Sequence, residues 1–151
     1  MAPIVAEIIV LRPPEEVFIF LADGEALPRW LPDFDEVEQL HPRGPIGRGT
    51  TYRYVLTRSR ARSTWSWTVV EPYTRLAWKG ASVRTIAPFN TMRPSGNYEL
   101  APVEGGTRVR ATIVTEYRGL MRLVSGLADR NAAETWQANL ERLKQIVESG
   151  A

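Results

Sequence analysis

The stretch TWSWTVV, Thr64 to Val70, sets two tryptophans one residue apart between hydroxyl-bearing residues. Side chains on a β-strand alternate between its two faces, so Trp65, Trp67 and Val69 share one face and the hydroxyl residues occupy the other. This alternation predicts a half-buried strand. Two indoles on the buried face have two interpretations, which the stretch alone leaves open. They fill a core, because aromatic side chains bury large apolar areas, or they line a cavity for an apolar molecule.

Similar alternation occurs on both sides of this stretch. TTYRYVLTRS precedes it, and RLAWKG, NYELAPV and TRVRATIVTEY follow it, with turn signals at EPYT and VEGG. A less regular segment, ASVRTIAPFNTMRPSG, separates RLAWKG from NYELAPV. Short alternating runs between turns predict one curled antiparallel sheet that is apolar on a single face.

Two short helices are predicted between a first strand and this sheet. The Val- and Ile-rich run from Ile4 to Leu11 predicts the strand. The sequence PPEE then begins a helix, because proline fits the first turn and carboxylates there favour the helix dipole. That helix is expected to end near Asp23 and Gly24. In EALPRWLPDF, Pro32 ends a second short helix whose bulkiest side chain is Trp30.

The C-terminal part of the chain changes its period. Trp136, Leu140, Leu143 and Val147 are spaced by four, three and four residues, and similar spacing extends upstream to Leu120. This predicts a long amphipathic helix. Whether the helix is interrupted at the Ser-Gly pair upstream stays open. The apolar stripe of the helix can cover the single apolar face of the sheet. Because a straight helix meets a strongly curved sheet poorly at one end, we expect a cavity between them.

The order of elements predicts an α+β fold for residues 1–151. A curved antiparallel sheet of six to seven strands wraps around a long C-terminal helix, and two short helices follow the first strand. A chain of 151 residues with 44% hydrophobic content fits a single domain with one core.

The composition argues against several kinds of chemistry. Cysteine is absent, which excludes disulfides, thiol catalysis and cysteine-based metal sites. One histidine, His41, cannot form a multi-histidine site, so we expect neither a metal nor a cofactor. A formal charge of +2 with interspersed signs leads us to expect no nucleic acid partner. The sequence contains no run of about 18 apolar residues, so no membrane span is predicted. The N-terminus lacks the basic start of a signal peptide. We therefore expect a cytoplasmic location.

Six motifs resemble the START-like superfamily in their order along the chain. They are RPPEEVFIFLAD, LPRWLPDF, PIGRGTTYR, WTVVEPYTRLAW, NYELAPVEGGTRVRATI and NLERLKQIVES. The superfamily includes polyketide cyclase/dehydrase and lipid-transport proteins, and it shares a helix-grip fold with the birch pollen allergen. The resemblance implies a hydrophobic cavity between sheet and C-terminal helix, used in the superfamily for sterols, lipids, polyketides, hormones or quinones. It implies no shared set of catalytic residues.

The leading hypothesis is that the chain binds a hydrophobic small molecule (a lipid, sterol, quinone or polyketide-like compound) as a monomer or weak homodimer. Ligand pockets are mostly apolar and aromatic, with a few polar groups, and hold about 300 to 1,000 Å³. The candidate ligand-binding residues are Trp30, Tyr52, Tyr54, Trp65, Trp67, Trp78, Tyr98, Ile113, Leu127 and Trp136. A register slip of one residue would exchange the strand residues that face the cavity.

An enzyme, a polyketide cyclase, aromatase or dehydratase, is the alternative function for the same cavity. It would need an acid and a base in an apolar cleft, where burial shifts their pKa values towards neutrality. The ionisable candidates are Arg53, Glu71, Glu99, Glu116, Tyr117, Asp33 and Asp35. Alternation places Arg53 and Glu116 opposite the aromatic face, while a turn explains Glu71 and solvent exposure explains Glu99.

A third class, an interaction module whose aromatic residues only fill the core, also remains open. His41 precedes a proline in a loop, which favours a surface position over a role as a proton shuttle. Arg58, Arg60 and Arg62 alternate at a hairpin tip. This spacing indicates a solvated edge rather than an anion or nucleic-acid site.

Overall fold

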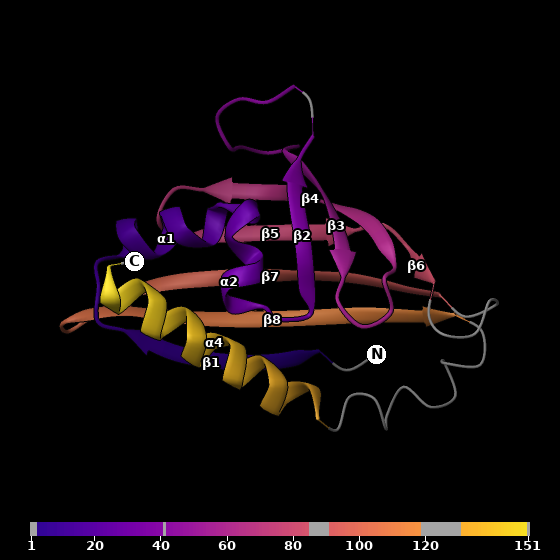
Figure 1. Ribbon diagram of the computed structural model, residues 1–151. Coiled ribbons are helices and arrows are strands. Elements are labelled where there is room, and N and C mark those ends of the chain that lie inside the picture. The colour runs from indigo at the N-terminus through magenta and orange to yellow at the C-terminus, as the bar shows by residue number, and fades with distance from the viewer. Residues whose placement is uncertain (1–2, 41, 85–90, 119–130, 151) are drawn as a thin grey trace.

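The computed structural model describes residues 3–40, 42–84, 91–118 and 131–150. Its elements are drawn in Figure 1. In chain order they are β1 (Ile4–Val10), α1 (Pro14–Ala22), the 3₁₀ helix η1 (Gly24–Ala26), α2 (Leu27–Trp30), β2 (Phe34–Gln39), β3 (Thr51–Leu56), β4 (Arg62–Glu71), β5 (Arg75–Gly80), β6 (Val83–Arg84), β7 (Thr91–Val103), β8 (Gly106–Arg118) and α4 (Ala132–Ser149).

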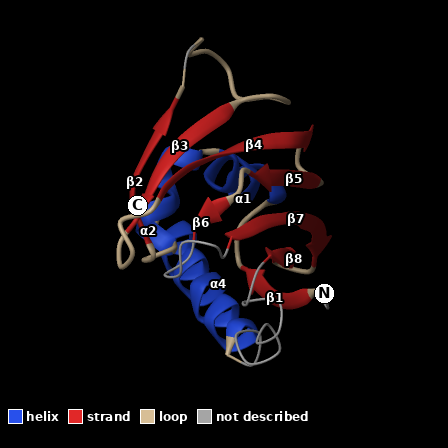
Figure 2. Cartoon of the chain, turned by 90° about the vertical axis from the view of Figure 1, so that its right-hand side faces the viewer, coloured by secondary structure: helices blue, strands red, loops and turns tan. Residues whose placement is uncertain are grey.

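The strands form one antiparallel sheet. Its continuous path is β1-β8-β7-β5-β4-β3-β2, and the two-residue strand β6 pairs with β7 outside this path. Figure 2 shows the sheet curving around α4, which lies on its concave side. The α+β helix-grip architecture and the six to seven strands expected from the sequence are therefore confirmed, with β6 as a short addition.

Proline and acidic residues define the helices that follow β1. Pro14 occupies the first turn of α1 and two glutamates follow it, as the sequence predicts. α1 ends at Ala22, and the side chain of Asp23 accepts a hydrogen bond from the backbone N–H of Glu25 at 3.2 Å, which begins η1. α2 then ends at Trp30, just before the predicted proline stop.

A β-bulge interrupts the alternation of the tryptophan strand β4. Trp67 lies opposite Trp78 of β5, but the register shifts between Trp67 and Val69. The extra residue brings Val70 onto the concave face, where it packs against the core. The prediction that Val69 shares the face of the two tryptophans is therefore wrong, because simple alternation cannot anticipate a bulge.

β7 begins at Thr91, within the segment expected to be irregular. Pro94 and Gly96 lie inside it and resemble strand breakers in the sequence. Pro94 nevertheless pairs with β8 in register. A Cβ at Gly96 would lie 2.8 Å from Cδ1 of Ile113, so glycine permits a close approach there rather than ending the strand. The prediction that NYELAPV begins this strand is corrected accordingly.

α4 covers the concave face with the predicted stripe. Leu140 and Leu143 on this helix are fully buried. Gln137 Nε2 donates to a backbone carbonyl of β1 at 2.9 Å, and Lys144 Nζ donates to another at 2.9 Å. These bonds cover the free edge of β1, which would otherwise present unpaired backbone groups. The upstream part of the predicted helix, including Leu127, lies outside the described residues.

Candidate functional site

An apolar cavity of about 50 Å³ lies between the sheet, the short helices and α4. Its helical side comes from α1, α2 and the first turns of α4, and its sheet side comes from β2, β4, β5 and β7. The lining residues are Leu21, Leu27, Leu31, Phe34, Trp65, Trp67, Trp78, Tyr98 and Trp136. All of them are apolar or aromatic, so the side-chain polar atoms that these described residues supply are indole nitrogens and the Tyr98 hydroxyl.

The cavity is small for a ligand site. A single water needs roughly 10 to 15 Å³, so the space holds a few waters, whereas ligand pockets hold about 300 to 1,000 Å³. Phe34, Trp78 and Trp136 on its margin are half-buried, while Trp65 and Trp67 are buried. The predicted gap between sheet and helix therefore exists, but aromatic rings fill most of it in this conformation.

Ring contacts bind the sheet side of the cavity together. Trp65 stacks on Tyr52 with ring centroids 4.5 Å apart. It also contacts Trp67 edge-on at 4.8 Å and Trp78 at 6.4 Å. Such aromatic pairs contribute roughly 0.5 to 1.5 kcal/mol beyond their burial. The two indoles of the TWSWTVV stretch thus form one packed cluster with their neighbours on β3 and β5.

Trp30 joins this cluster to α4. Its ring lies 6.1 Å from that of Tyr98 and 6.2 Å from that of Trp136, both in edge-to-face geometry. Phe34 packs edge-on against Tyr54 at 5.0 Å. The helical side of the cavity therefore consists of leucines and the half-buried Trp136, and Trp30 packs against Trp136.

Two donors of the sheet converge on the end of α1. Trp67 Nε1 donates to the carbonyl oxygen of Ala22 at 3.2 Å, and the Tyr52 hydroxyl donates to the same oxygen at 3.4 Å. A Cβ at Gly24 would lie 2.6 Å from the Tyr52 ring and 2.8 Å from that of Trp65. The absence of a side chain at Gly24 is what lets η1 approach these rings.

Three other indole donors of the cluster have no acceptor within the described part of the chain. The Nε1 atoms of Trp30, Trp65 and Trp78 are buried and make no hydrogen bond to any residue that the structure describes. A buried donor without a partner costs about 1 to 3 kcal/mol, so three such groups in one cluster are unusual. Two of them, Trp65 and Trp78, belong to residues that line the cavity.

Tyr98 is the one titratable residue among the described side chains that line the cavity. Burial raises the pKa of its hydroxyl well above its ordinary value. The indole N–H of Trp78 lies beside the hydroxyl and opposes this rise in pKa, although its geometry falls short of a hydrogen bond. The hydroxyl therefore stays protonated at neutral pH and can donate a hydrogen bond, but it is a poor base.

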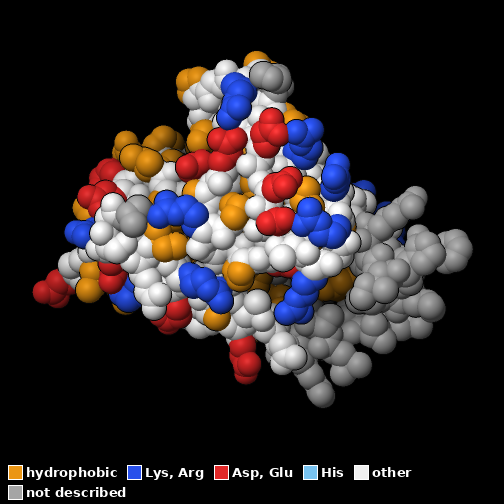
Figure 3. Space-filling view, viewed as in Figure 1, with side chains coloured by type: hydrophobic (Ala, Val, Ile, Leu, Met, Phe, Trp, Pro, Cys, Tyr) orange, Lys and Arg blue, Asp and Glu red, His pale blue; other side chains and the backbone are white. Residues whose placement is uncertain are grey.

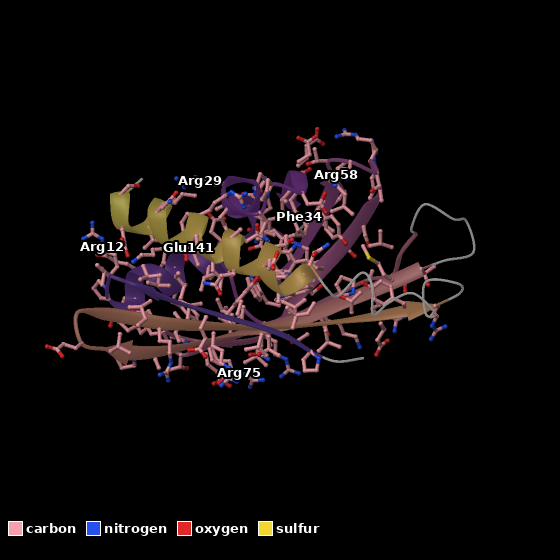
Figure 4. All side chains as sticks on the ribbon, turned by 90° about the horizontal axis from the view of Figure 1, so that it is seen from below. Arg12, Arg29, Phe34, Arg58, Arg75 and Glu141 are labelled. Carbon is pink, nitrogen blue, oxygen red and sulfur yellow. The ribbon has the colours of Figure 1, made fainter. Side chains whose placement is uncertain are left out.

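The charged candidates for catalysis lie away from the cavity. Arg53 forms an exposed ion pair with Glu38 on the neighbouring strand. Glu71 lies 3.9 Å from Arg75 across the turn between β4 and β5, and both are exposed. Figure 4 shows Arg75 on the side of the sheet away from α4, and Phe34 on the same side as the helix.

The remaining ionisable candidates also fail to enter the cavity. Asp35 pairs with Arg60 at 2.5 Å on the surface. Burial raises the pKa of Asp33, while the charge of Arg58 lowers it, but Asp33 is not a lining residue. One glutamate of β7, and one glutamate and one tyrosine of β8, do not line the cavity either. They are Glu99, Glu116 and Tyr117.

The structure brings half of the predicted ligand-binding residues onto the cavity wall, and these are Trp65, Trp67, Trp78, Tyr98 and Trp136. Trp30 does not line the cavity, but its ring contacts those of Tyr98 and Trp136. Tyr52, Tyr54 and Ile113 are buried in the surrounding core instead. Leu127 and His41 lie outside the described residues, so their roles are not tested.

Four lining residues escaped the sequence prediction, and they come from α1, from α2 and the residue that follows it, and from the start of β2. They are Leu21, Leu27, Leu31 and Phe34. The signal was present in LPRWLPDF, where apolar side chains flank Trp30. The large indole of Trp30 makes it the most conspicuous apolar side chain of this motif, whereas leucines beside it are equally typical of an ordinary core.

Metal sites and membrane spans are not indicated in the described part of the chain. No group of three or more metal-ligating side chains occurs there, and none of its helices combines the length and hydropathy of a membrane span. Positive and negative side chains intermix over the face shown in Figure 3. This face therefore offers no single-sign surface for a highly charged partner.

Known proteins share this sequence pattern and this fold. Uncharacterized proteins of Mycobacterium tuberculosis and Mycobacterium bovis are 32% identical over 111 residues, which is 72% of this chain. The chain spans 62% of the length of these relatives.

Solved structures confirm the helix-grip fold. A START superfamily protein from Mycobacterium smegmatis matches with a TM-score of 0.74 and 15% identity, over 99% of both chains. The di-domain aromatase/cyclase StfQ from the steffimycin biosynthetic pathway matches with a TM-score of 0.73 and 12% identity, over 98% of this chain and 51% of StfQ. A family model described as polyketide cyclase / dehydrase and lipid transport matches residues 1–148. The chain therefore belongs to the polyketide cyclase / dehydrase and lipid transport family.

Proposed function

We propose that this protein binds an apolar small molecule, such as a sterol, quinone, neutral lipid or polyketide-like compound, between its sheet and α4. The observation that carries this proposal is the aromatic cavity at that position, with a few polar atoms in an otherwise apolar wall. Family membership supports hydrophobic ligand binding in general terms. The mycobacterial relatives are longer than this chain. That a protein of their full length also binds such a molecule is therefore part of the same proposal.

The wall favours an uncharged ligand. None of the described residues that line the cavity is Arg, Lys, Asp or Glu. A carboxylate or ammonium group enclosed there would lose its hydration without gaining a partner of opposite charge, which costs several kcal/mol. Neutral ring systems and neutral lipids therefore fit better than free fatty acids.

Binding requires the cavity to enlarge, and the contact between Trp30 and Trp136 is the place where it can do so. Trp136 is half-buried on the second turn of α4 and contacts Trp30 edge-on at 6.2 Å. A single aromatic pair of this kind is worth roughly 0.5 to 1.5 kcal/mol. Displacing Trp136 would open the cavity at its half-buried margin. The free energy that this costs can be offset by burial of an apolar ligand.

Native mass spectrometry and binding titrations with sterols, quinones, fatty acids and polyphenols test this function. We expect a one-to-one complex with at least one neutral class and weaker binding of fatty acids. Trp136→Ala should change the affinity for the ligand at least about fivefold. The substitution either removes an aromatic contact with the ligand or enlarges the cavity. Ile9→Ala, at a 48% exposed position on β1, serves as the matched control and should leave the affinity unchanged. Failure of every compound in the panel to bind would contradict the proposal.

Catalysis by a polyketide cyclase or dehydratase is the second candidate, and one observation favours it. Tyr98 keeps a protonated hydroxyl inside the cavity, where it could stabilise charge that develops on a substrate carbonyl oxygen. None of the described lining residues supplies a base to accompany it. Incubation of a linear poly-β-ketone thioester with the wild type and with Tyr98→Phe tests this candidate. Cyclisation at the same rate with and without the wild-type protein would exclude it.

A further inference from the structure

We infer that the cavity selects apolar molecules that carry a neutral oxygen acceptor, such as a ketone or quinone carbonyl, and that Trp78 and Tyr98 bind this oxygen. The inference deepens the proposed function and rests on it. Its basis is a contrast between donors on the same sheet, some of which have a partner within the protein and some of which have none.

The first step is the position of the Trp78 indole. A Cβ at Gly96 would lie 3.0 Å from Trp78 Nε1, so the indole nitrogen lies over the concave face of β7. Tyr98 is two residues further along β7 on the same face, and its hydroxyl lies beside this nitrogen. Both residues line the cavity. Two donors thus meet at one place on the cavity wall.

The second step is that the fold leaves the Trp78 donor unpaired. Trp78 Nε1 is buried with no acceptor among the described residues, and its geometry with Tyr98 is too poor for a hydrogen bond. Burial keeps the Tyr98 hydroxyl protonated. An oxygen with two lone pairs could accept from both groups, and doing so would remove the cost of a buried unpaired donor.

The third step is the contrast with Trp67. This indole comes from the adjacent strand and lines the same cavity, yet its N–H is bonded to the carbonyl oxygen of Ala22. The Tyr52 hydroxyl shares that acceptor. Trp67 thus differs from Trp30, Trp65 and Trp78, whose buried indole N–H groups have no acceptor among the described residues. Trp78 differs because its nitrogen faces β7 and the cavity rather than a helix end.

The charge of the wall restricts the acceptor to a neutral group. No described lining residue carries a positive charge that could pair with a carboxylate or a phosphate. Indole and phenol donors without a cation suit a carbonyl oxygen, for which desolvation is far less costly than for an anion. The preferred ligand is therefore a ring system or chain that bears a ketone rather than an acid.

A matched pair of ligands tests the inference, namely fluorene and 9-fluorenone, which differ by one carbonyl group. We expect fluorenone to bind roughly tenfold more tightly, the factor that corresponds to one hydrogen bond to a donor otherwise left unpaired. Fluorene-1-carboxylate should bind more weakly than either. If fluorene and fluorenone bind equally, the inference is overturned while the proposed function stands. If neither binds, the proposed function fails together with the inference.

Nitrogen-15 NMR of the wild type locates the oxygen without any mutation. The chain contains five tryptophans, so five indole N–H signals are expected. Fluorenone should move the Trp78 indole proton downfield, as hydrogen bonding does, and fluorene should not. The Trp67 signal is the internal control, because its N–H already has an acceptor. A downfield shift confined to other indoles would overturn the assignment to Trp78.

Paired variants complete the test. Trp78→Phe removes the free donor and keeps a ring, so fluorenone should lose its advantage over fluorene. Trp67→Phe removes a donor that is already bonded, so the advantage should remain. Tyr98→Phe should reduce the advantage in part. Persistence of the full tenfold preference in Trp78→Phe would contradict the inference, and the NMR result decides the matter if that variant does not fold.

Discussion

Trp67 donates its indole N–H to the carbonyl oxygen of Ala22 at 3.2 Å, and this bond joins β4 to the C-terminal end of α1. The carbonyl oxygens at a helix end have no partner within the helix, so a donor from the sheet satisfies one of them. On the adjacent strand, Trp78 lies opposite Trp67 in register. Its indole N–H has no such acceptor among the described residues. Two tryptophans that are alike in the sequence therefore differ in what they do.

This difference predicts that two similar variants lose different amounts of stability. Trp67→Phe should lower the free energy of unfolding by about 1 to 2 kcal/mol more than Trp78→Phe does, because only the first removes a made hydrogen bond. Urea denaturation followed by circular dichroism measures both. Equal destabilisation by the two substitutions would mean that the bond to Ala22 contributes little.

Gly24 is predicted to be intolerant of any side chain. Gly24→Ala would place a Cβ 2.6 Å from the Tyr52 ring, inside a cluster with no free volume on that side. Such overpacking costs about 1 to 3 kcal/mol, and η1 should shift away from β3 and β4. Gly47→Ala is the matched control, since a Cβ there meets nothing within 4 Å. A midpoint in urea that is unchanged by Gly24→Ala would contradict the packing described above.

Alkaline pH should destabilise the protein through Tyr98. Burial raises the pKa of this hydroxyl in the folded state above its ordinary value of 10.0, so the unfolded chain loses the proton first. Below about pH 10 both states hold the proton and there is no effect, and above it the free energy of unfolding falls as the pH rises. Denaturation between pH 9 and 12 should show this fall. Tyr98→Phe should make it shallower, and an unchanged slope would contradict the burial of a protonated hydroxyl.

Acidic pH should loosen the contact between α4 and the end of β1. Glu148 accepts hydrogen bonds from Lys144 Nζ at 2.5 Å and from the backbone N–H of Leu11 at 2.8 Å. These bonds lower the pKa of the carboxyl group, so the stability they provide is present at neutral pH and lost as the pH falls through that pKa. Amide hydrogen exchange at Leu11 should accelerate in Glu148→Gln at neutral pH. Because Glu148 is only half-buried and lies at the end of α4, a loss of global stability as large as that of Gly24→Ala would be unexpected.

The sheet and its covering helix could be predicted from local patterns, because alternation and helical spacing report directly on which side chains are buried. The departures occur where a local signal conflicts with a long-range contact. Pro94 and Gly96 resemble breakers, yet β8 holds them in a regular ladder. The bulge of β4 shifts Val70 onto the concave face, and no residue in the sequence marks it.

The cavity could be predicted only in outline. The aromatic side chains of β4, β5 and β7 were identified because alternation places them on one face. Leu27 and Leu31 were missed because the path of two short helices across that face depends on tertiary contacts. The fit between rings, which leaves about 50 Å³, depends on side-chain rotamers that a sequence pattern does not encode. The same is true of the partners of each indole N–H.

The most direct test of ligand binding between sheet and helix is a crystal structure of the protein with 9-fluorenone, or with the tightest binder of the panel. We predict that the compound lies between Trp65, Trp78 and Tyr98 on one side and a displaced Trp136 on the other. Its oxygen should lie within hydrogen-bond distance of Trp78 Nε1. A compound bound only on the outer surface, with Trp30 and Trp136 still in contact and the cavity unchanged, would contradict the proposed function.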